Sequence, residues 1–148
     1  MVHIKPVDES SVEVCAYLKC TEEQREYTNS PIWSLLQTAY TPLNEHCKMY
    51  AIFNDSEVVG MVRLDFTLFE DFYMFTNLLI DKDYQRKHYA SEAIKCILNV
   101  FKNDGRYTQV KIHVDPQNTA AIALYKKAGF QYVGEVFDGV FSEYEIGI

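Results

Sequence analysis

Residues 78–91 read Leu-Leu-Ile-Asp-Lys-Asp-Tyr-Gln-Arg-Lys-His-Tyr-Ala-Ser and pass from an apolar strand through a charged loop into an amphipathic helix. A helix start presents backbone N–H groups without carbonyl partners and the positive end of the helix dipole. Gln85, Arg86, Lys87 and His88 add side-chain donors immediately before it. The junction therefore predicts an anion site, with phosphate as the natural ligand. The loop alone is equally compatible with a basic segment that only water solvates.

The composition indicates one folded domain over residues 1–148. Hydrophobic residues make up 48% of the chain and aromatic residues 14%, which is too apolar for a disordered segment. The first residues include Lys5, Asp8 and Glu9 in place of an apolar core, and no later stretch is long and uncharged enough to span a bilayer. We therefore expect a cytoplasmic protein without a membrane partner.

Charge and cysteine usage narrow the classes of partner further. The net charge is −7 and the isoelectric point is near 5.0, which argues against a nucleic-acid partner and favours a small cationic one. The cysteines show no Cys-x-x-Cys pair and no histidine at metal-ligand spacing; they are Cys15, Cys20, Cys47 and Cys96. We interpret them as reduced thiols, and we expect no metal site.

The first half of the chain predicts a meander of strands with helices around it. Strand patterns cover residues 2–6, 49–53, 58–66 and 72–80, and helical patterns cover residues 9–19 and 32–40. Ser30-Pro31 opens the second helix, because serine caps a helix well and proline is tolerated at its first position. The consecutive strands between residues 49 and 80 are therefore expected to pair antiparallel.

The second half predicts a strand–helix–strand unit. Apolar residues between 90 and 101 recur at helical spacing, and Asn103-Asp104-Gly105 supplies a stop before a strand over 108–114. The strands on either side of this helix should be parallel and joined by a right-handed crossover, with ligands binding beyond their carboxyl ends. A helix from about 116–118 to 127–128 and a hairpin over 131–148, turning at Asp138-Gly139, complete an α/β chain of α+β character.

Asn118 and Tyr125 lie two helical turns apart on the last predicted helix, so both side chains fall on nearly the same face. The pair can contact one elongated ligand. Asn118 is equally well explained as a helix cap, and Tyr125 as a core aromatic residue with its hydroxyl at the surface.

Two motifs in this chain resemble those of the GCN5-related N-acetyltransferases (GNATs). Residues 85–90, Gln-Arg-Lys-His-Tyr-Ala, are similar to the acetyl-CoA motif Q/R-x-x-G-x-G/A. Residues 118–130, Asn-Thr-Ala-Ala-Ile-Ala-Leu-Tyr-Lys-Lys-Ala-Gly-Phe, are similar to the motif N-x-x-A-x-x-L-Y-x-x-x-G-F. The resemblance implies the GNAT fold, a mixed and mostly antiparallel sheet of about six to seven strands flanked by about four helices, with a βαβ acetyl-CoA-binding core.

Carried over by position, the resemblance implies that the backbone of Leu78, Leu79 and Ile80 pairs with the pantetheine arm of acetyl-CoA. The loop and helix start would hold the pyrophosphate, through Gln85, Arg86, Lys87, His88, Tyr89, Ala90 and Ser91. Asn118 would contact the arm of acetyl-CoA from the opposite wall. Tyr125 would act as the general acid that protonates the departing thiolate.

The loop departs from the motif at its first glycine position, which holds His88; the second holds Ala90, which the motif accepts. Glycine reaches a positive φ at little cost, and histidine reaches it less readily. His88 therefore either weakens acetyl-CoA binding or adds its own hydrogen bond to a phosphate.

The resemblance leaves the general base unassigned. Many relatives carry a glutamate on the strand before the phosphate loop, where this chain has Met74, and Thr76 and Asn77 cannot act as bases. Carboxylates and aromatic rings suit a cationic substrate, because an ammonium group pairs with the former and rests over the latter. We expect the substrate site among Tyr27, Trp33, Glu70, Asp71 and Asn77, with Glu70 and Asp71 either accepting a proton through water or only binding the cation.

We therefore expect an acetyl-CoA-dependent N-acetyltransferase that acts by direct attack of a primary amine, with a polyamine or diamine such as spermine or spermidine as substrate. This finer expectation rests on residues 30–40 and the Leu-Leu-Ile-Asp segment, which look most like those of bacterial diamine or spermine/spermidine acetyltransferases. The alternatives are a GNAT acting on a protein N-terminus or an aminoglycoside, and a non-catalytic acyl-CoA-binding module. A Walker-type loop is excluded because GxxxxGK[ST] is absent. An exposed last strand would support a homodimer.

Overall fold

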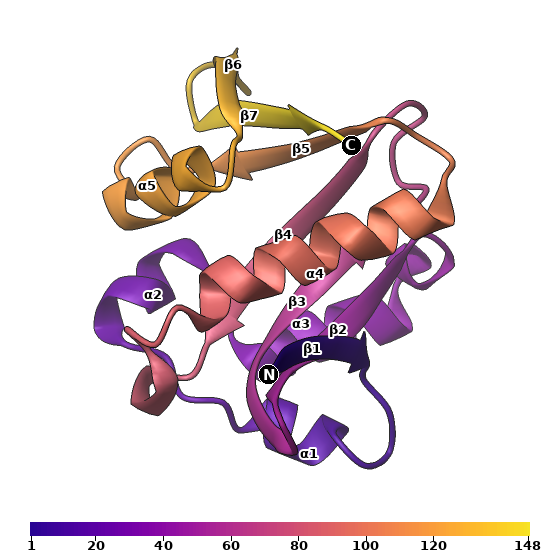
Figure 1. Ribbon diagram of the computed structural model, residues 1–148, viewed down its shortest axis with the longest axis vertical. Helices are drawn as coiled ribbons and strands as arrows, with labels where there is room; N and C mark the ends of the chain where they lie inside the picture. Colours follow the sequence, from indigo (N-terminus) through magenta and orange to yellow (C-terminus); the bar gives the residue numbers. More distant parts are fainter.

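The computed structural model describes residues 1–148 as one seven-stranded sheet with helices on both faces (Figure 1). The strands are β1 (Val2–Pro6), β2 (Cys47–Asn54), β3 (Glu57–Asp65), β4 (Tyr73–Ile80), β5 (Gln109–Val114), β6 (Gln131–Val136) and β7 (Phe141–Gly147). The α-helices are α1 (Val12–Ala16), α2 (Glu22–Tyr27), α3 (Pro31–Tyr40), α4 (Tyr89–Asp104) and α5 (Thr119–Lys127), with 3-10 turns η1 (Pro42–Glu45) and η2 (Lys82–Tyr84). None of the helices has the length and apolar character that a membrane crossing requires.

The strand order is β1-β2-β3-β4-β5-β7-β6, and every neighbouring pair except β4 and β5 is antiparallel. The predicted meander is therefore confirmed as β2, β3 and β4. The strand–helix–strand unit is confirmed as β4, α4 and β5, whose strands run parallel. The mixed, mostly antiparallel fold that the sequence predicted is the one observed.

Side-chain alternation along the strands divides the interior into two layers. On the face that α4 crosses in Figure 1, α4 packs through Ile94, Ile97 and Phe101 against alternate residues of the central strands. On the other face, a smaller cluster around Cys15, Leu18, Met49, Met61 and Leu79 lies beneath α1 and α3. Each face of the sheet therefore has its own apolar cluster.

The helix predicted over residues 9–19 is shorter in the structure, where α1 spans Val12–Ala16. The chain leaves the helix because the Lys19 backbone pairs with the segment after β4: the Lys19 N–H donates to the Asp81 carboxylate at 2.8 Å, and the Lys19 carbonyl accepts from Lys82 N–H at 2.9 Å. These long-range bonds are invisible in the local sequence pattern.

The sequence interpretation also missed α2, although the sequence carries a signal for it. Thr21-Glu22-Glu23-Gln24 forms a capping box, in which the Gln24 N–H donates to the Thr21 hydroxyl at 3.1 Å and the Thr21 N–H donates to the Gln24 side chain at 2.8 Å. A Thr followed three residues later by Gln is the sequence signature of this cap, and it places a helix start at the right position.

The remaining boundary predictions are confirmed by their backbone geometry. Ser30 caps α3 by accepting from the Trp33 N–H at 3.2 Å, and α4 ends at Gly105 with φ of 75°. The final hairpin turns at Asp138 and Gly139, whose φ angles are 56° and 84°, as a type I′ turn requires.

A β-bulge interrupts β4 where it passes β3. Met61 pairs with Leu79, but Arg63 pairs with Thr76, so β4 contains one extra residue, and Asn77 has a φ of 54°. The bulge reverses the alternation of β4: Phe75 and Ile80 point to the α4 face, whereas Leu79 points to the opposite face.

Gly60 of β3 permits the close approach of β4 beside the bulge. A Cβ atom at this position would lie 2.2 Å from the Leu79 carbonyl oxygen and 2.9 Å from Ile80 Cδ1. Glycine is therefore required here by contact with backbone, which cannot move aside as a flexible side chain would.

Tyr73 fixes the other end of β4, where the strand still pairs with β5. Its ring is fully buried and stacks on Phe101 at 4.4 Å, and its hydroxyl donates to Asp104 at 2.6 Å while accepting from the Arg106 N–H at 2.8 Å. The ladder between β4 and β5 contains only Tyr73–Val110 and Met74–Lys111, so the two strands part beyond Met74.

The Gly60→Ala variant tests this account of the bulge. We expect it to lower the free energy of unfolding by about 1–3 kcal/mol, because β3 and β4 must separate to admit the methyl group. Gly147→Ala is the matched control, since its nearest neighbour, the Thr108 carbonyl oxygen, is 3.9 Å away. Denaturant unfolding measures both, and equal stability of the two variants would contradict the proposed backbone contact.

Candidate functional site

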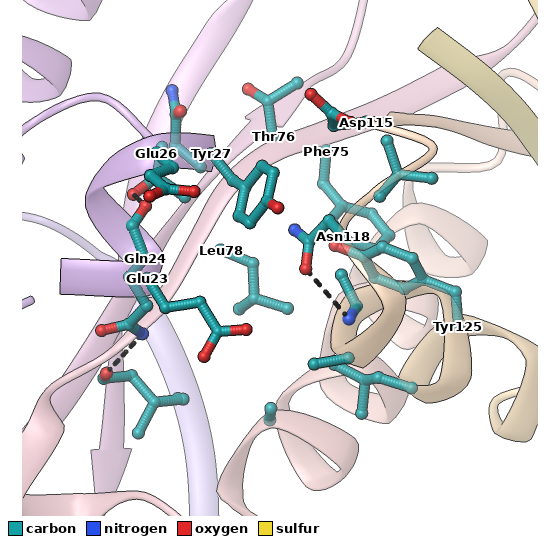
Figure 2. Close-up of a pocket in the computed structure, with 18 of the residues that line it drawn as sticks. Glu23, Gln24, Glu26, Tyr27, Phe75, Thr76, Leu78, Asp115, Asn118 and Tyr125 are labelled. Atoms are coloured by element: carbon teal, nitrogen blue, oxygen red, sulfur yellow. Dashed lines mark hydrogen bonds between the residues drawn. The ribbon is translucent and has the colours of Figure 1, made fainter. Parts of the chain in front are cut away.

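The parting of β4 and β5 opens a cleft of about 920 Å³ that runs from α2 to the start of α4. Its walls are the bulged half of β4, the end of β5, the first turns of α5, the loop before α4, and α2 with the residues that flank it. Figure 2 shows Tyr27, Leu78, Asn118 and Tyr125 pointing into this space from α2, β4 and α5.

The loop at one end of the cleft exposes backbone N–H groups. Arg86 and His88 both adopt left-handed conformations, with φ of 62° and 64°, and α4 begins directly after His88. The first hydrogen bond of the helix runs from the Glu92 N–H to the His88 carbonyl, so the N–H groups of Tyr89, Ala90 and Ser91 have no partner within the helix. This geometry leaves N–H donors and the Arg86 side chain where the sequence predicts an anion site, and anion binding there stays a prediction.

His88 occupies the glycine position of the motif in a conformation that glycine favours. It is the N-cap residue of α4, and its side chain makes no capping hydrogen bond. A left-handed conformation costs an ordinary L-residue about 1–2 kcal/mol, although histidine tolerates it better than β-branched residues. The loop therefore keeps the shape of the motif at the expense of backbone strain.

The loop is joined to α2 through a single carbonyl group. The Ile80 carbonyl oxygen accepts hydrogen bonds from the Gln24 and Gln85 side-chain amides, each at 3.1 Å. Through these two bonds, α2 and the loop before α4 are both attached to the end of β4.

Asn118 and Tyr125 both line the cleft, and each also satisfies the simpler structural explanation. The Asn118 side-chain oxygen caps α5 by accepting from the Ala121 N–H at 3.3 Å. The Tyr125 ring packs edge-on against Phe75 and Phe130, with centroids 6.0 Å apart in both pairs. Burial raises the pKa of Tyr125 to about 12, so its hydroxyl remains protonated at neutral pH.

The end of the cleft beneath α2 is acidic. Glu23, Glu26 and Asp115 line it together with Tyr27 (Figure 2). Burial raises the pKa of Tyr27, and the negative charges of Glu26, Asp115 and Glu23 raise it further. The cleft therefore carries both signs of charge, with Arg86 and unpaired N–H groups at the start of α4, carboxylates beneath α2, and Arg63 in the lining as well.

The structure brings together most of the residues that the sequence nominated. The cleft lining includes Leu78, Ile80, Gln85, Arg86, His88, Tyr89, Ala90, Ser91, Asn118 and Tyr125 from the expected acetyl-CoA site, and Tyr27 and Asn77 from the expected substrate site.

Five nominated residues lie outside this lining. The Leu79 side chain points to the opposite face of the sheet because of the bulge, and the Lys87 ammonium group lies over the Tyr84 ring at 5.8 Å. Trp33 is on α3, where half of its surface is exposed. Glu70 and Asp71 precede β4, at the end where this strand still pairs with β5, whereas the cleft opens beyond Met74.

Tertiary structure adds lining residues that the sequence interpretation did not nominate. The charged or titratable ones are Glu23, Glu26, Arg63, Tyr84, His113 and Asp115. The capping box at Thr21 was the available signal for the two glutamates, because it predicts the helix that carries them. No local sequence pattern distinguishes His113 from the other polar positions of an alternating strand.

The cleft fits a long ligand with an anionic end. The Thr76 hydroxyl is buried in its wall without a hydrogen-bond partner, and the edge of β4 beyond Met74 has no ladder partner on the β5 side. Unpaired donors and acceptors of this kind suit an extended ligand that pairs along a strand. No group of three or more His, Cys, Asp or Glu side chains is arranged to hold a metal ion.

Comparison with solved structures identifies the fold. An aminoglycoside acetyltransferase, AAC(6')-Ib, in complex with coenzyme A superposes with a TM-score of 0.81 at 16% identity, covering 99% of this chain and 95% of the other. The spermidine N-acetyltransferase from Vibrio cholerae, in complex with CoA and spermine, superposes with a TM-score of 0.78 at 14% identity, covering 99% and 95%. RimL, a ribosomal L7/L12 alpha-N-protein acetyltransferase in complex with coenzyme A, gives 0.75 at 18% identity, covering 99% and 94%.

The sequence comparison assigns the family. No curated protein matches this chain significantly. The profile of the Acetyltransferase (GNAT) family matches residues 13–130, which include the loop before α4 and the whole of α5. With its split sheet and its coenzyme A-binding structural neighbours, the chain belongs to the GNAT family of N-acetyltransferases, which take their acyl group from acetyl-CoA.

Proposed function

We propose that this enzyme acetylates a primary amine of a polyamine or diamine such as spermine or spermidine, with Tyr125 as the general acid. The observation that carries the proposal is the polarity of the cleft. The cleft lining combines the unpaired N–H groups at the start of α4 and Arg86 with the carboxylates of Glu23, Glu26 and Asp115, and Tyr125 lines the same cleft. A ligand pair with one polyanionic and one polycationic member fits this distribution of charge.

The residues at the α4 end would hold acetyl-CoA, which supplies the acetyl group as a thioester. The free N–H groups of Tyr89, Ala90 and Ser91 and the Arg86 side chain suit its pyrophosphate. The unpaired edge of β4 at Leu78 suits its pantetheine arm, and Asn118 contributes from the opposite wall because its side-chain oxygen caps α5 while its amide nitrogen stays free.

The residues at the α2 end would hold the amine substrate. Glu23 and Glu26 lie on one turn of α2, with Asp115 across the cleft and the Tyr27 ring between them. Several carboxylates around one aromatic ring suit a chain of ammonium groups joined by methylenes better than a single peptide N-terminus. Aminoglycosides share the high positive charge and are the competing substrate class.

Tyr125 would protonate the thiolate that leaves. Its ring is fixed between Phe75 and Phe130, and its hydroxyl makes no hydrogen bond to another protein group. Burial raises its pKa to about 12, so the proton is present at neutral pH, and the same burial would raise the basicity of the leaving thiolate that accepts it. We also propose that the protein is a single domain, is located in the cytoplasm and forms a homodimer.

Tyr125→Phe should lower kcat by about 10²-fold, because the variant removes the proton donor and leaves the ring packing intact. The loss should be similar across the neutral and mildly alkaline range, since Tyr125 does not titrate there. Steady-state kinetics and thermal unfolding measure the two effects. Native turnover in a correctly folded variant would remove Tyr125 from the mechanism.

Substrate profiling tests the acidic wall. We expect higher kcat/KM for spermine, spermidine and short diamines than for aminoglycosides or peptide N-termini. Glu23→Gln and Glu26→Gln should each raise KM for spermidine about 2–5-fold, since an exposed ion pair contributes up to about 1 kcal/mol.

Glu22→Gln is the matched control for the acidic wall, because Glu22 shares the helix but does not line the cleft. The rise in KM that Glu23→Gln and Glu26→Gln cause should be smaller at high salt, because salt screens the charges. The affinity for acetyl-CoA should be unchanged in all three variants. Preference for peptide N-termini would overturn the polyamine assignment.

Substitutions at His88 test the strain in the phosphate loop. His88→Gly should tighten acetyl-CoA binding about 3–10-fold and His88→Val should weaken it, because glycine adopts the left-handed conformation freely and valine resists it. Titration calorimetry of acetyl-CoA measures both. Weaker binding by His88→Gly would show instead that the imidazole contacts the phosphates itself.

A further inference from the structure

The proposed reaction requires a group that takes a proton from the incoming amine. An alkylammonium group with a pKa of about 10 must lose a proton at a cost of roughly 4 kcal/mol at neutral pH before it can attack. Met74, Thr76 and Asn77 supply no base, and Glu70 and Asp71 do not line the cleft. The acceptor must therefore come from another part of the cleft wall.

His113 is the one histidine at the carboxyl end of β5, and it lines the cleft. Its register partner across the sheet is Glu143 of β7, and the His113 Nε2 atom lies 2.8 Å from Glu143 Oε2. Both side chains are only 16% exposed. The imidazole is further enclosed by Phe137 and Phe141 of the final hairpin, at centroid distances of 5.6 Å and 6.4 Å.

Glu143 determines which imidazole nitrogen is free. Burial raises the pKa of Glu143, but the hydrogen bond with His113 and the Lys111 ammonium group at 3.3 Å outweigh burial, so its pKa is lowered. Glu143 is therefore ionised at neutral pH and accepts the hydrogen of His113 Nε2. The neutral imidazole then carries its lone pair on Nδ1, which makes no hydrogen bond to the protein.

His113 and Tyr125 approach the cleft from opposite faces of the sheet. Val110, Ile112 and Val114 of β5 point to the α4 face, so His113 points to the other face. Tyr125 packs on Phe75 and Phe130, which belong to the α4 face. A group transferred through the gap between β4 and β5 would thus meet a proton acceptor on one side and a proton donor on the other.

We propose that His113, oriented by Glu143 and accepting at Nδ1, is the general base that deprotonates the amine. The inference rests on the proposed acetyl transfer. In it His113 is a catalytic residue, since it contacts the substrate nitrogen, and Glu143 is a positioning residue that acts through His113.

The proton balance closes with these two residues. The ammonium group gives one proton to His113 Nδ1, and the freed lone pair forms the C–N bond to the acetyl carbon while the C–S bond breaks. The sulfur takes its proton from the Tyr125 hydroxyl, and the second proton of the nitrogen returns to the Tyr125 oxygen through water. His113 then releases its proton to solvent, which leaves an amide, a thiol and one proton.

Charged groups from several elements lie around His113. Glu143 of β7 faces it directly, Lys111 of β5 neutralises part of the Glu143 charge, and Arg63 of β3, Asp115 just after β5 and Glu26 of α2 share the cleft wall. Protonation of His113 removes the acceptor, so activity should fall on the acid side of the profile.

The test compares His113→Ala, His113→Gln and Glu143→Gln with the native enzyme on spermidine across pH. We expect kcat/KM of both His113 variants to fall about 10²-fold at neutral pH and their acid limb to disappear, because that limb reports the base. Added imidazole should restore part of the His113→Ala rate. Glu143→Gln should lower kcat by a smaller factor and shift the acid limb, as a positioning residue would.

Two readouts do not depend on turnover. Calorimetry should show unchanged acetyl-CoA affinity in all three variants, and 15N NMR of the free native protein should show His113 with its proton on Nε2. His46→Ala is the control, because His46 is a partly buried histidine bound to the Thr67 hydroxyl outside the cleft.

The outcomes separate the two proposals. A native enzyme that acetylates none of the amines overturns the acetyl-transfer function itself. If the native enzyme is active and its His113 variants fold, bind acetyl-CoA and keep their rate and acid limb, only the roles of His113 and Glu143 are overturned. A spectrum that shows the proton of His113 on Nδ1 has the same consequence.

Discussion

The interrupted ladder between β4 and β5 is the constraint on which the site depends. Tyr73 and Met74 hold the strands together at one end, and the bulge at Asn77 carries β4 away from β5 at the other. The buried Tyr73 hydroxyl ties the closed end to Asp104 and to the backbone of Arg106. Without this combination of a fixed and an open end, the sheet would close and its edges would satisfy each other instead of a ligand.

The split also divides the chemistry between two faces. Because side chains alternate along β5, one face receives the apolar layer that fixes Tyr125, and the other receives the polar pair of His113 and Glu143. Along the length of the cleft, the start of α4 contributes positive potential and α2 contributes carboxylates. The cleft therefore combines helix N–H donors and Arg86 at the start of α4 with a group of three carboxylates near α2, Glu23, Glu26 and Asp115.

The loop before α4 keeps the backbone conformation of the motif although its first glycine position holds His88. His88 keeps a φ of 64° because the loop is held on both sides, by the start of α4 and by Gln85 bonded to the Ile80 carbonyl. Structural neighbours at 14–18% identity share this fold, and they include an aminoglycoside, a spermidine and a ribosomal-protein acetyltransferase. The fold alone therefore does not identify the substrate of this chain.

The sequence by itself determined the meander, the crossover through α4, the anion loop, and the Asn118 and Tyr125 positions, because each depends on local periodicity, capping or a contiguous motif. Only the tertiary structure decided which carboxylates face the cleft: it placed Glu23 and Glu26 there and left Glu70 and Asp71 outside. The tertiary structure alone brought His113 next to Glu143, which lies thirty positions later in the chain. Strand register and the bulge set these pairings, and both arise from long-range backbone contacts that no local pattern encodes.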